Sequence, residues 1–112
     1  MNTAFHASAL FRANKNRVTP LIRDWLSQNG FALETPLDFV PIVAKKPSSF
    51  PALTDRQTGT TMNIIVEELD EICSVSVLHQ VSKIFIIGGI IMGNMLAAQV
   101  EALTAHIRQG LE

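Results

Sequence analysis

The chain has 112 residues, of which 47% are hydrophobic and 17% are charged, a length and composition that fit one folded domain and exclude a disordered segment. Its formal net charge of −1 provides no global field to attract nucleic acid or an acidic membrane. A single cysteine excludes an internal disulfide, and the first residues lack the basic start and apolar core of a secretory signal, so we expect a cytoplasmic protein.

Residues 1–16 allow two interpretations. Apolar and polar residues alternate from Phe5 to Ala9, as they do in a short strand. The following Leu10 and Phe11 also suit the start of a helix.

The first clear helix signal covers residues Pro20–Asn29. Thr19 has the side chain of an N-cap, and the missing N–H of Pro20 does no harm at a first helical position. Gly30 followed by Phe31 predicts a left-handed, Schellman-type end. Basic residues at positions 12, 15 and 17 precede the helix and allow its extension by one turn.

Strand signals follow. Leu37–Ala44 is typical of a strand, and Pro41 either places it at a sheet edge or breaks it, because proline has no N–H for a neighbouring strand. Residues 47–59 form a long loop. Thr61–Leu69 and Ile72–Ser82 alternate apolar and polar residues, which predicts a hairpin with one covered face and one wetter face. The turn between them lacks glycine, so the register stays open.

The C-terminal part predicts a long helix from Ile87 to about Gln109, with an apolar stripe at helical spacing. Residues 84–98 carry no charge, yet this stretch is shorter than the roughly 20 apolar residues that cross a bilayer. Gly89, Gly93 and Ala97 recur every four residues and form a flat groove where another backbone can approach. The first half of the helix is apolar on all sides, so it needs cover on more than one side.

No group of residues has the spacing of a catalytic or metal site. The three histidines and Cys73 fall on separate predicted elements, and His79 on an apolar strand face is typical of a core-edge histidine with one satisfied nitrogen. Cys73 is best explained as a small buried hydrophobe. The acidic residues around Asp70 form a solvated turn, and the Gly88–Gly89 step matches no phosphate-binding motif. We therefore expect no enzyme, no cofactor and no metal.

The order of elements predicts an α+β fold with two layers, in which a three- or four-stranded antiparallel sheet is packed by a long C-terminal helix and a shorter N-terminal helix. We expect a single domain over residues 1–110, followed by Leu111 and Glu112 as the remnant of an expression tag. Similar element orders occur in secretion-chaperone-like domains and in helix-grip folds that hold lipids, an analogy without a motif specific to either.

The incompletely covered helix leads to two hypotheses. The first is a non-catalytic, protein-binding module that forms a homodimer through this helix; the expected interface comprises Gly89, Gly93, Ala97, Phe50 and Leu53. The second is a carrier of an apolar small molecule between sheet and helix; its expected pocket is lined by Met62, Ile64, Val66, Val75, Val77, Ile91 and Met95. Neither hypothesis includes nucleic acid or a membrane span.

Overall fold

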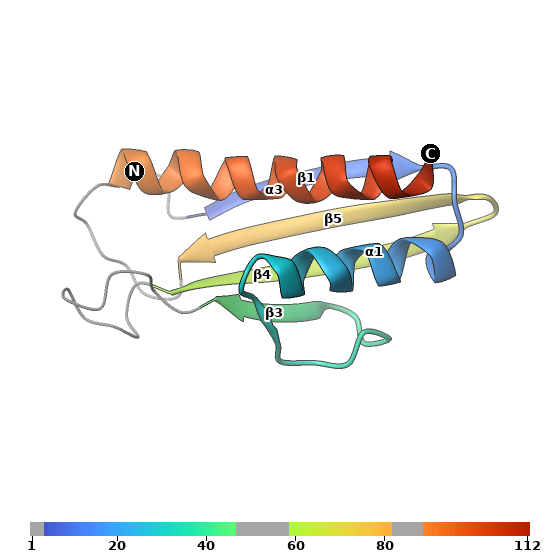
Figure 1. Ribbon diagram of the computed structural model, residues 1–112, viewed down its shortest axis with the longest axis horizontal. Helices are drawn as coiled ribbons and strands as arrows, with labels where there is room; N and C mark the ends of the chain where they lie inside the picture. The colour runs from blue at the N-terminus through green and yellow to red at the C-terminus, as the bar shows by residue number, and fades with distance from the viewer. Residues whose placement is uncertain (1–3, 47–58, 82–88) are drawn as a thin grey trace.

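The computed structural model describes residues 4–46, 59–81 and 89–112 (Figure 1). Its elements follow the chain as β1 (Ala4–Phe11), α1 (Lys15–Gln28), β2 (Ala32–Leu33), β3 (Ile42–Lys46), β4 (Thr60–Leu69), β5 (Ile72–Val81) and α3 (Gly89–Leu111). The five strands form one antiparallel sheet in the order β1-β5-β4-β3-β2. The predicted α+β fold is confirmed, and the predicted three or four strands are corrected to five.

The difference in strand number comes from the two edge strands, of which β1 was left open between two interpretations and β2 was not predicted. β1 pairs with β5 along its whole length, from Ala4 opposite Gln80 to Phe11 opposite Cys73. The alternation from Phe5 onwards therefore belongs to a strand. β2 has only two residues, which pair with β3, and a segment of that length is too short to show a periodic pattern.

The predicted hairpin is present and its register is now fixed. β4 and β5 are joined by a two-residue turn between Leu69 and Ile72, which lie opposite each other. Asp70 in this turn has a φ of 58°, a left-handed conformation that aspartate tolerates better than most side chains. Alternate residues of both strands are buried on one face and more exposed on the other, as the pattern predicted.

Helix α1 begins at Lys15, five positions before the predicted start, and Pro20 lies inside it. Asn14 is the N-cap, because its side-chain oxygen accepts the backbone N–H of Arg17 at 3.0 Å. The predicted Schellman-type end is confirmed. Gly30 has a φ of 83°, the N–H of Phe31 donates to the Leu26 carbonyl at 2.9 Å, and the N–H of Gly30 donates to the Ser27 carbonyl at 3.4 Å.

Strand β3 starts at Ile42, later than the predicted start at Leu37. Turns precede it, and the Val40–Pro41 peptide is cis. Since Pro41 has no N–H to donate, pairing with β4 begins only where Ile42 lies opposite Ile64. The predicted interruption at Pro41 is therefore confirmed.

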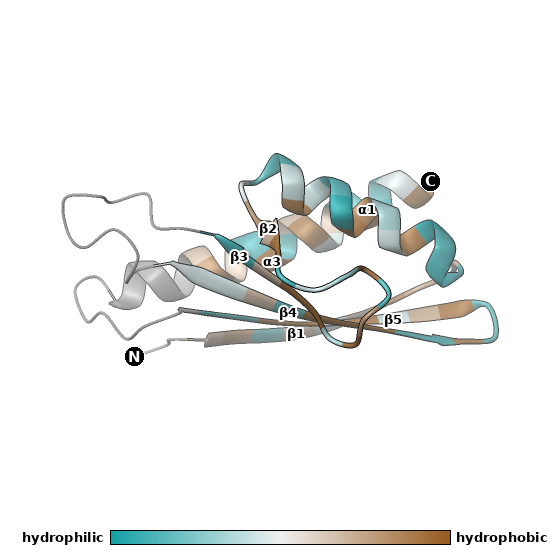
Figure 2. Cartoon of the chain, turned by 90° about the horizontal axis from the view of Figure 1, so that it is seen from below, coloured by the Kyte–Doolittle hydropathy of each residue, from teal (hydrophilic) through white to brown (hydrophobic). Residues whose placement is uncertain are grey.

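Both described helices pack on the same face of the sheet, and no described helix or strand covers the other face (Figure 2). The apolar stripe predicted for α3 is buried on that face and consists of Leu96, Val100, Leu103 and Ile107. Helix α1 buries a stripe of its own, which consists of Val18, Ile22, Trp25 and Leu26. Each such side chain contributes roughly 1.5–3 kcal/mol by leaving water. Leu111 belongs to α3 and packs partly buried against this core. In the described ranges, no helix combines the length and hydropathy needed to cross a bilayer.

Candidate functional site

The covered face of β4 and β5 brings together five of the residues expected to line an apolar pocket. Ile64 lies opposite Val77, and Val66 lies opposite Val75. Together with Met62, these side chains are at most 4% exposed and belong to the continuous core beneath α1 and α3. In the described part of the chain, this wall is therefore in contact with core side chains.

The predicted functional residues of α3 differ from one another in their exposure. Met95 is 36% exposed whereas the next residue, Leu96, is fully buried, so Met95 is turned away from the wall. Ala97 is half-buried at a flank of the helix. Gly89, Ile91 and Gly93 belong to α3, but the surroundings of their side chains are not described. Phe50 and Leu53 lie outside the described residues.

His79 is a polar residue on the covered wall, and its exposed fraction is 0%. Its Nδ1 lies 3.2 Å from the carbonyl oxygen of Leu96. Because a carbonyl oxygen only accepts, the neutral ring carries its proton on Nδ1. The buried Nε2 has no hydrogen-bond partner in the part of the chain that the structure describes. This agrees with the sequence-based prediction of a buried histidine with one satisfied nitrogen.

Burial lowers the pKa of His79 below its ordinary value of 6.5, because the charged ring would lose its hydration. The hydrogen bond to Leu96 opposes this shift, and the positive charge of Lys46 adds to it. The ring of Phe31 meets His79 edge-on with 5.8 Å between centroids, and Trp25 stacks on Phe31 at the same centroid distance. His79 thus belongs to a row of ring contacts with Phe31 and Trp25, and its burial favours the neutral ring.

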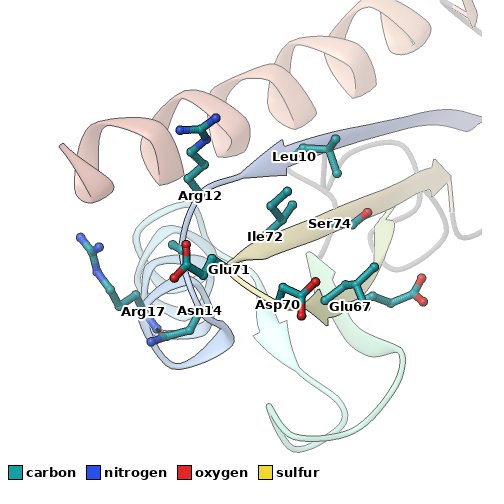
Figure 3. Close-up of a pocket in the computed structure, with 11 residues that line it drawn as sticks. Leu10, Arg12, Asn14, Arg17, Glu67, Asp70, Glu71, Ile72 and Ser74 are labelled. Atoms are coloured by element: carbon teal, nitrogen blue, oxygen red, sulfur yellow. Dashed lines mark hydrogen bonds between the residues drawn. The ribbon is translucent and has the colours of Figure 1, made fainter.

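A groove opens at the other end of the sheet, beside the turn between β4 and β5 (Figure 3). Leu10, Leu69 and Ile72 line it and are 66%, 77% and 44% exposed. Basic residues come from the β1–α1 connection and from α1, and acidic residues come from the hairpin: Arg12 and Arg17, with Glu67, Asp70 and Glu71. The groove therefore combines exposed apolar surface with both signs of charge.

Glu68 and Cys73 lie opposite each other close to this end of the sheet. The Glu68 carboxylate accepts the backbone N–H of Lys15 in the first turn of α1, where negative charge is favoured. Cys73 is fully buried, and burial together with the charge of Glu68 raises the pKa of its thiol while Lys15 opposes the shift. The predicted burial of Cys73 is confirmed, and its environment favours the thiol over the reactive thiolate.

Sequence reasoning missed the groove because its lining comes from segments far apart in the chain. One signal was available in the hairpin. Leu69 and Ile72 are large apolar residues at positions whose alternation assigns them to the wetter face. Within the described ranges, no three histidine, cysteine, aspartate or glutamate side chains converge as metal ligands.

Comparisons with known proteins bear on the fold. Neither the family models nor the sequences of characterised proteins give a match to this chain. A solution NMR structure of a protein from Arthrobacter aurescens is similar to it, with a TM-score of 0.52 and 11% identity over 96% of this chain and 87% of that one. A crystal structure of a protein from Thermus thermophilus gives a TM-score of 0.42 and 10% identity over 96% and 93% of the two chains. The first likeness defines the chain as a small α+β domain of this fold and carries no function with it.

Proposed function

We propose that this protein is a non-catalytic interaction module that associates with a second copy of itself through α3. Among the described residues of a single chain, helix α3 is covered on its inner side only. Its inner stripe is buried, whereas Met95, Ala98, Ala102 and Ala105 on the outer side are exposed. The exposed outer side of α3 is the observation that supports the proposal most directly.

The sequence of α3 adds a second argument. Residues 89–98 contain one polar side chain, Asn94, and otherwise glycine, alanine, isoleucine, leucine and methionine. The spacing of 3.6 residues per turn distributes such a segment around the whole helix, and a single sheet can cover only one side of a helix. A second copy covers the other side in a soluble protein.

The oligomeric state tests this proposal. Light scattering coupled to size exclusion, over roughly 1–100 μM, is expected to give a mass twice the 12.3 kDa of the chain, because interfaces of standard size bind well within that range. A mass of one chain at the highest concentration would contradict the proposal.

A second candidate is the carrier of an apolar small molecule between sheet and helix. The Nε2 of His79, which has no hydrogen-bond partner among the described residues, favours it, because a buried acceptor in an apolar wall can orient a hydroxyl-bearing guest. Native mass spectrometry of freshly purified protein is expected to show a mass adduct that the variant His79→Leu retains poorly. Spectra of the bare chain for both proteins would remove this candidate.

A further inference from the structure

The groove beside the turn between β4 and β5, the hairpin groove, has an apolar floor. Leu69 and Ile72 lie opposite each other on β4 and β5, and Leu10 on β1 lies opposite Ser74, two residues after Ile72. The three apolar side chains are therefore direct or diagonal neighbours on the sheet. Leu69 and Leu10 are also the two most exposed large hydrophobic residues in the part of the chain that the structure describes.

This floor is unusual for its place in the sheet. The alternation assigns Leu10, Leu69 and Ile72 to the face away from both described helices, where an antiparallel sheet normally carries polar residues (Figure 2). Because these side chains stay largely in water, they add little to the stability of the fold. Their burial against a partner is favourable by about 25 cal/mol per Å², so the floor contributes to binding.

The rim that the hairpin forms along this floor is acidic. Glu67, Asp70 and Glu71 line the groove, and all three are exposed (Figure 3). The ion pairs found among the described residues involve other side chains, and residues 67–72 contain no lysine or arginine. The hairpin rim thus places negative charge next to apolar surface, and cationic side chains of a partner complement it.

The rim on the side of the β1–α1 connection is basic. It carries Arg12 and Arg17, and the Arg17 guanidinium also donates a hydrogen bond to the carbonyl of Leu111 at 3.3 Å. Three carboxylates against two guanidinium groups leave one negative charge on the lining of the groove. Such a balance disfavours nucleic acid and anionic lipid, whose phosphates seek clusters of lysine and arginine.

We propose that the hairpin groove binds an amphipathic helix of a partner protein, with apolar side chains on the floor and lysine or arginine side chains against the hairpin rim. Leu10, Ile72 and Leu69 stand on three adjacent strands and span about 10 Å at about 4.8 Å per strand. Residues i and i+7 on one face of a helix are about 10.5 Å apart, with residues i+3 and i+4 between them. The floor therefore matches consecutive anchors of a helix that lies in a groove. This inference goes beyond self-association through α3 and does not depend on it.

A designed peptide tests the kind of partner. The probe is a fluorescein-labelled helix of about four turns with leucine on one face and lysine on both flanks of that face. One control peptide carries glutamate in place of every lysine, and another carries alanine in place of every leucine. Fluorescence anisotropy is expected to show saturable binding of the lysine peptide and at least about tenfold weaker binding of both controls. Equal binding of either control overturns the inference.

Matched variants of the protein test the place of binding. Leu69→Ser removes an exposed floor side chain and is expected to weaken the lysine peptide about tenfold, whereas Phe39→Ser, which changes a 57% exposed residue outside the groove, leaves it within about twofold. Glu71→Lys is expected to weaken the peptide about tenfold, and Asp38→Lys makes the same change in net charge outside the groove with less than about twofold effect. Circular dichroism checks that all four variants fold.

The outcomes separate this inference from the proposed function. A monomeric protein that binds the lysine peptide contradicts self-association and keeps the inference. Equal weakening by Asp38→Lys and Glu71→Lys overturns the inference, because net charge then explains the binding. A dimer that Leu69→Ser dissociates also overturns it, since the groove then holds a second copy. Binding to vesicles of phosphatidylcholine and phosphatidylglycerol that Leu69→Ser abolishes overturns it in favour of lipid.

Discussion

Replacing His79 by leucine is expected to remove an acid sensitivity that the buried ring gives to the fold. The pKa of His79 is lowered in the folded state, so the folded protein resists the proton that the unfolded chain takes up. The contribution of His79 to the free energy of unfolding is therefore fully present above the ordinary pKa of 6.5. It is lost as the pH falls from 6.5 towards the lower pKa of His79 in the folded state. The slope for one such group is at most about 1.4 kcal/mol per pH unit.

The expected change in the free energy of unfolding follows from that slope. Between pH 7.5 and 5.5 the wild-type free energy of unfolding falls by up to about 1.4 kcal/mol through this group, the limit reached when the folded state binds no proton. His79→Leu also loses the hydrogen bond to Leu96, about 1 kcal/mol, and relieves the unpartnered Nε2, about 1–3 kcal/mol. At pH 7.5 the variant is therefore expected to be as stable as the wild type or somewhat more stable.

Urea unfolding at several pH values measures this effect through the fluorescence of Trp25, the single tryptophan, which is 4% exposed. The stability difference between His79→Leu and the wild type is expected to widen as the pH falls. Parallel pH profiles for wild type and His79→Leu would refute the reasoning.

Three further substitutions test local features of the fold by the same unfolding measurement. Gly30→Ala forces a side chain into the left-handed region and is expected to cost about 1–2 kcal/mol, more than Gly30→Asn; equal costs would argue against the C-terminal geometry of α1. Asn14→Ala removes the N-cap and is expected to cost about 1 kcal/mol, whereas Asn16→Ala in the exposed first turn changes little. Ile64→Ala is expected to cost about 2–5 kcal/mol and its neighbour Ile65→Ala, on the open face, under about 1 kcal/mol; similar values would mean that the covered face is misassigned.

The hairpin and the end of α1 were predictable because their signals are local. Alternation over two neighbouring strands assigns every residue to a face, and Gly30 followed by Phe31 marks a helix end within a few residues. The buried stripe of α3 was predictable for the same reason. A period of 3.6 residues selects Leu96, Val100, Leu103 and Ile107 without knowledge of their neighbours.

The start of α1 was not predictable from local signals. Asn14 and Thr19 are both suitable N-caps, and Pro20 favours the later start. The contact that distinguishes the earlier start comes from Glu68, which accepts the N–H of Lys15 across 53 residues of sequence. The interpretation of the first residues stayed open and the hairpin groove was missed for a similar reason, because the partners of β1 lie on β5 and the groove joins three segments. Tertiary contacts thus decided what the local pattern left open.

The pairing of the first strand with the last one has a consequence for biosynthesis. β4 and β5 meet across two residues, whereas Ser8 reaches Ser76 only after 68 positions of chain have been made. During translation β1 therefore waits, uncharged and without its neighbour, until β5 has emerged. Closing so long a loop slows folding relative to helical bundles of similar size. The nascent chain is consequently most exposed to misassembly at its own beginning, and chaperone capture would act first on residues 4–11.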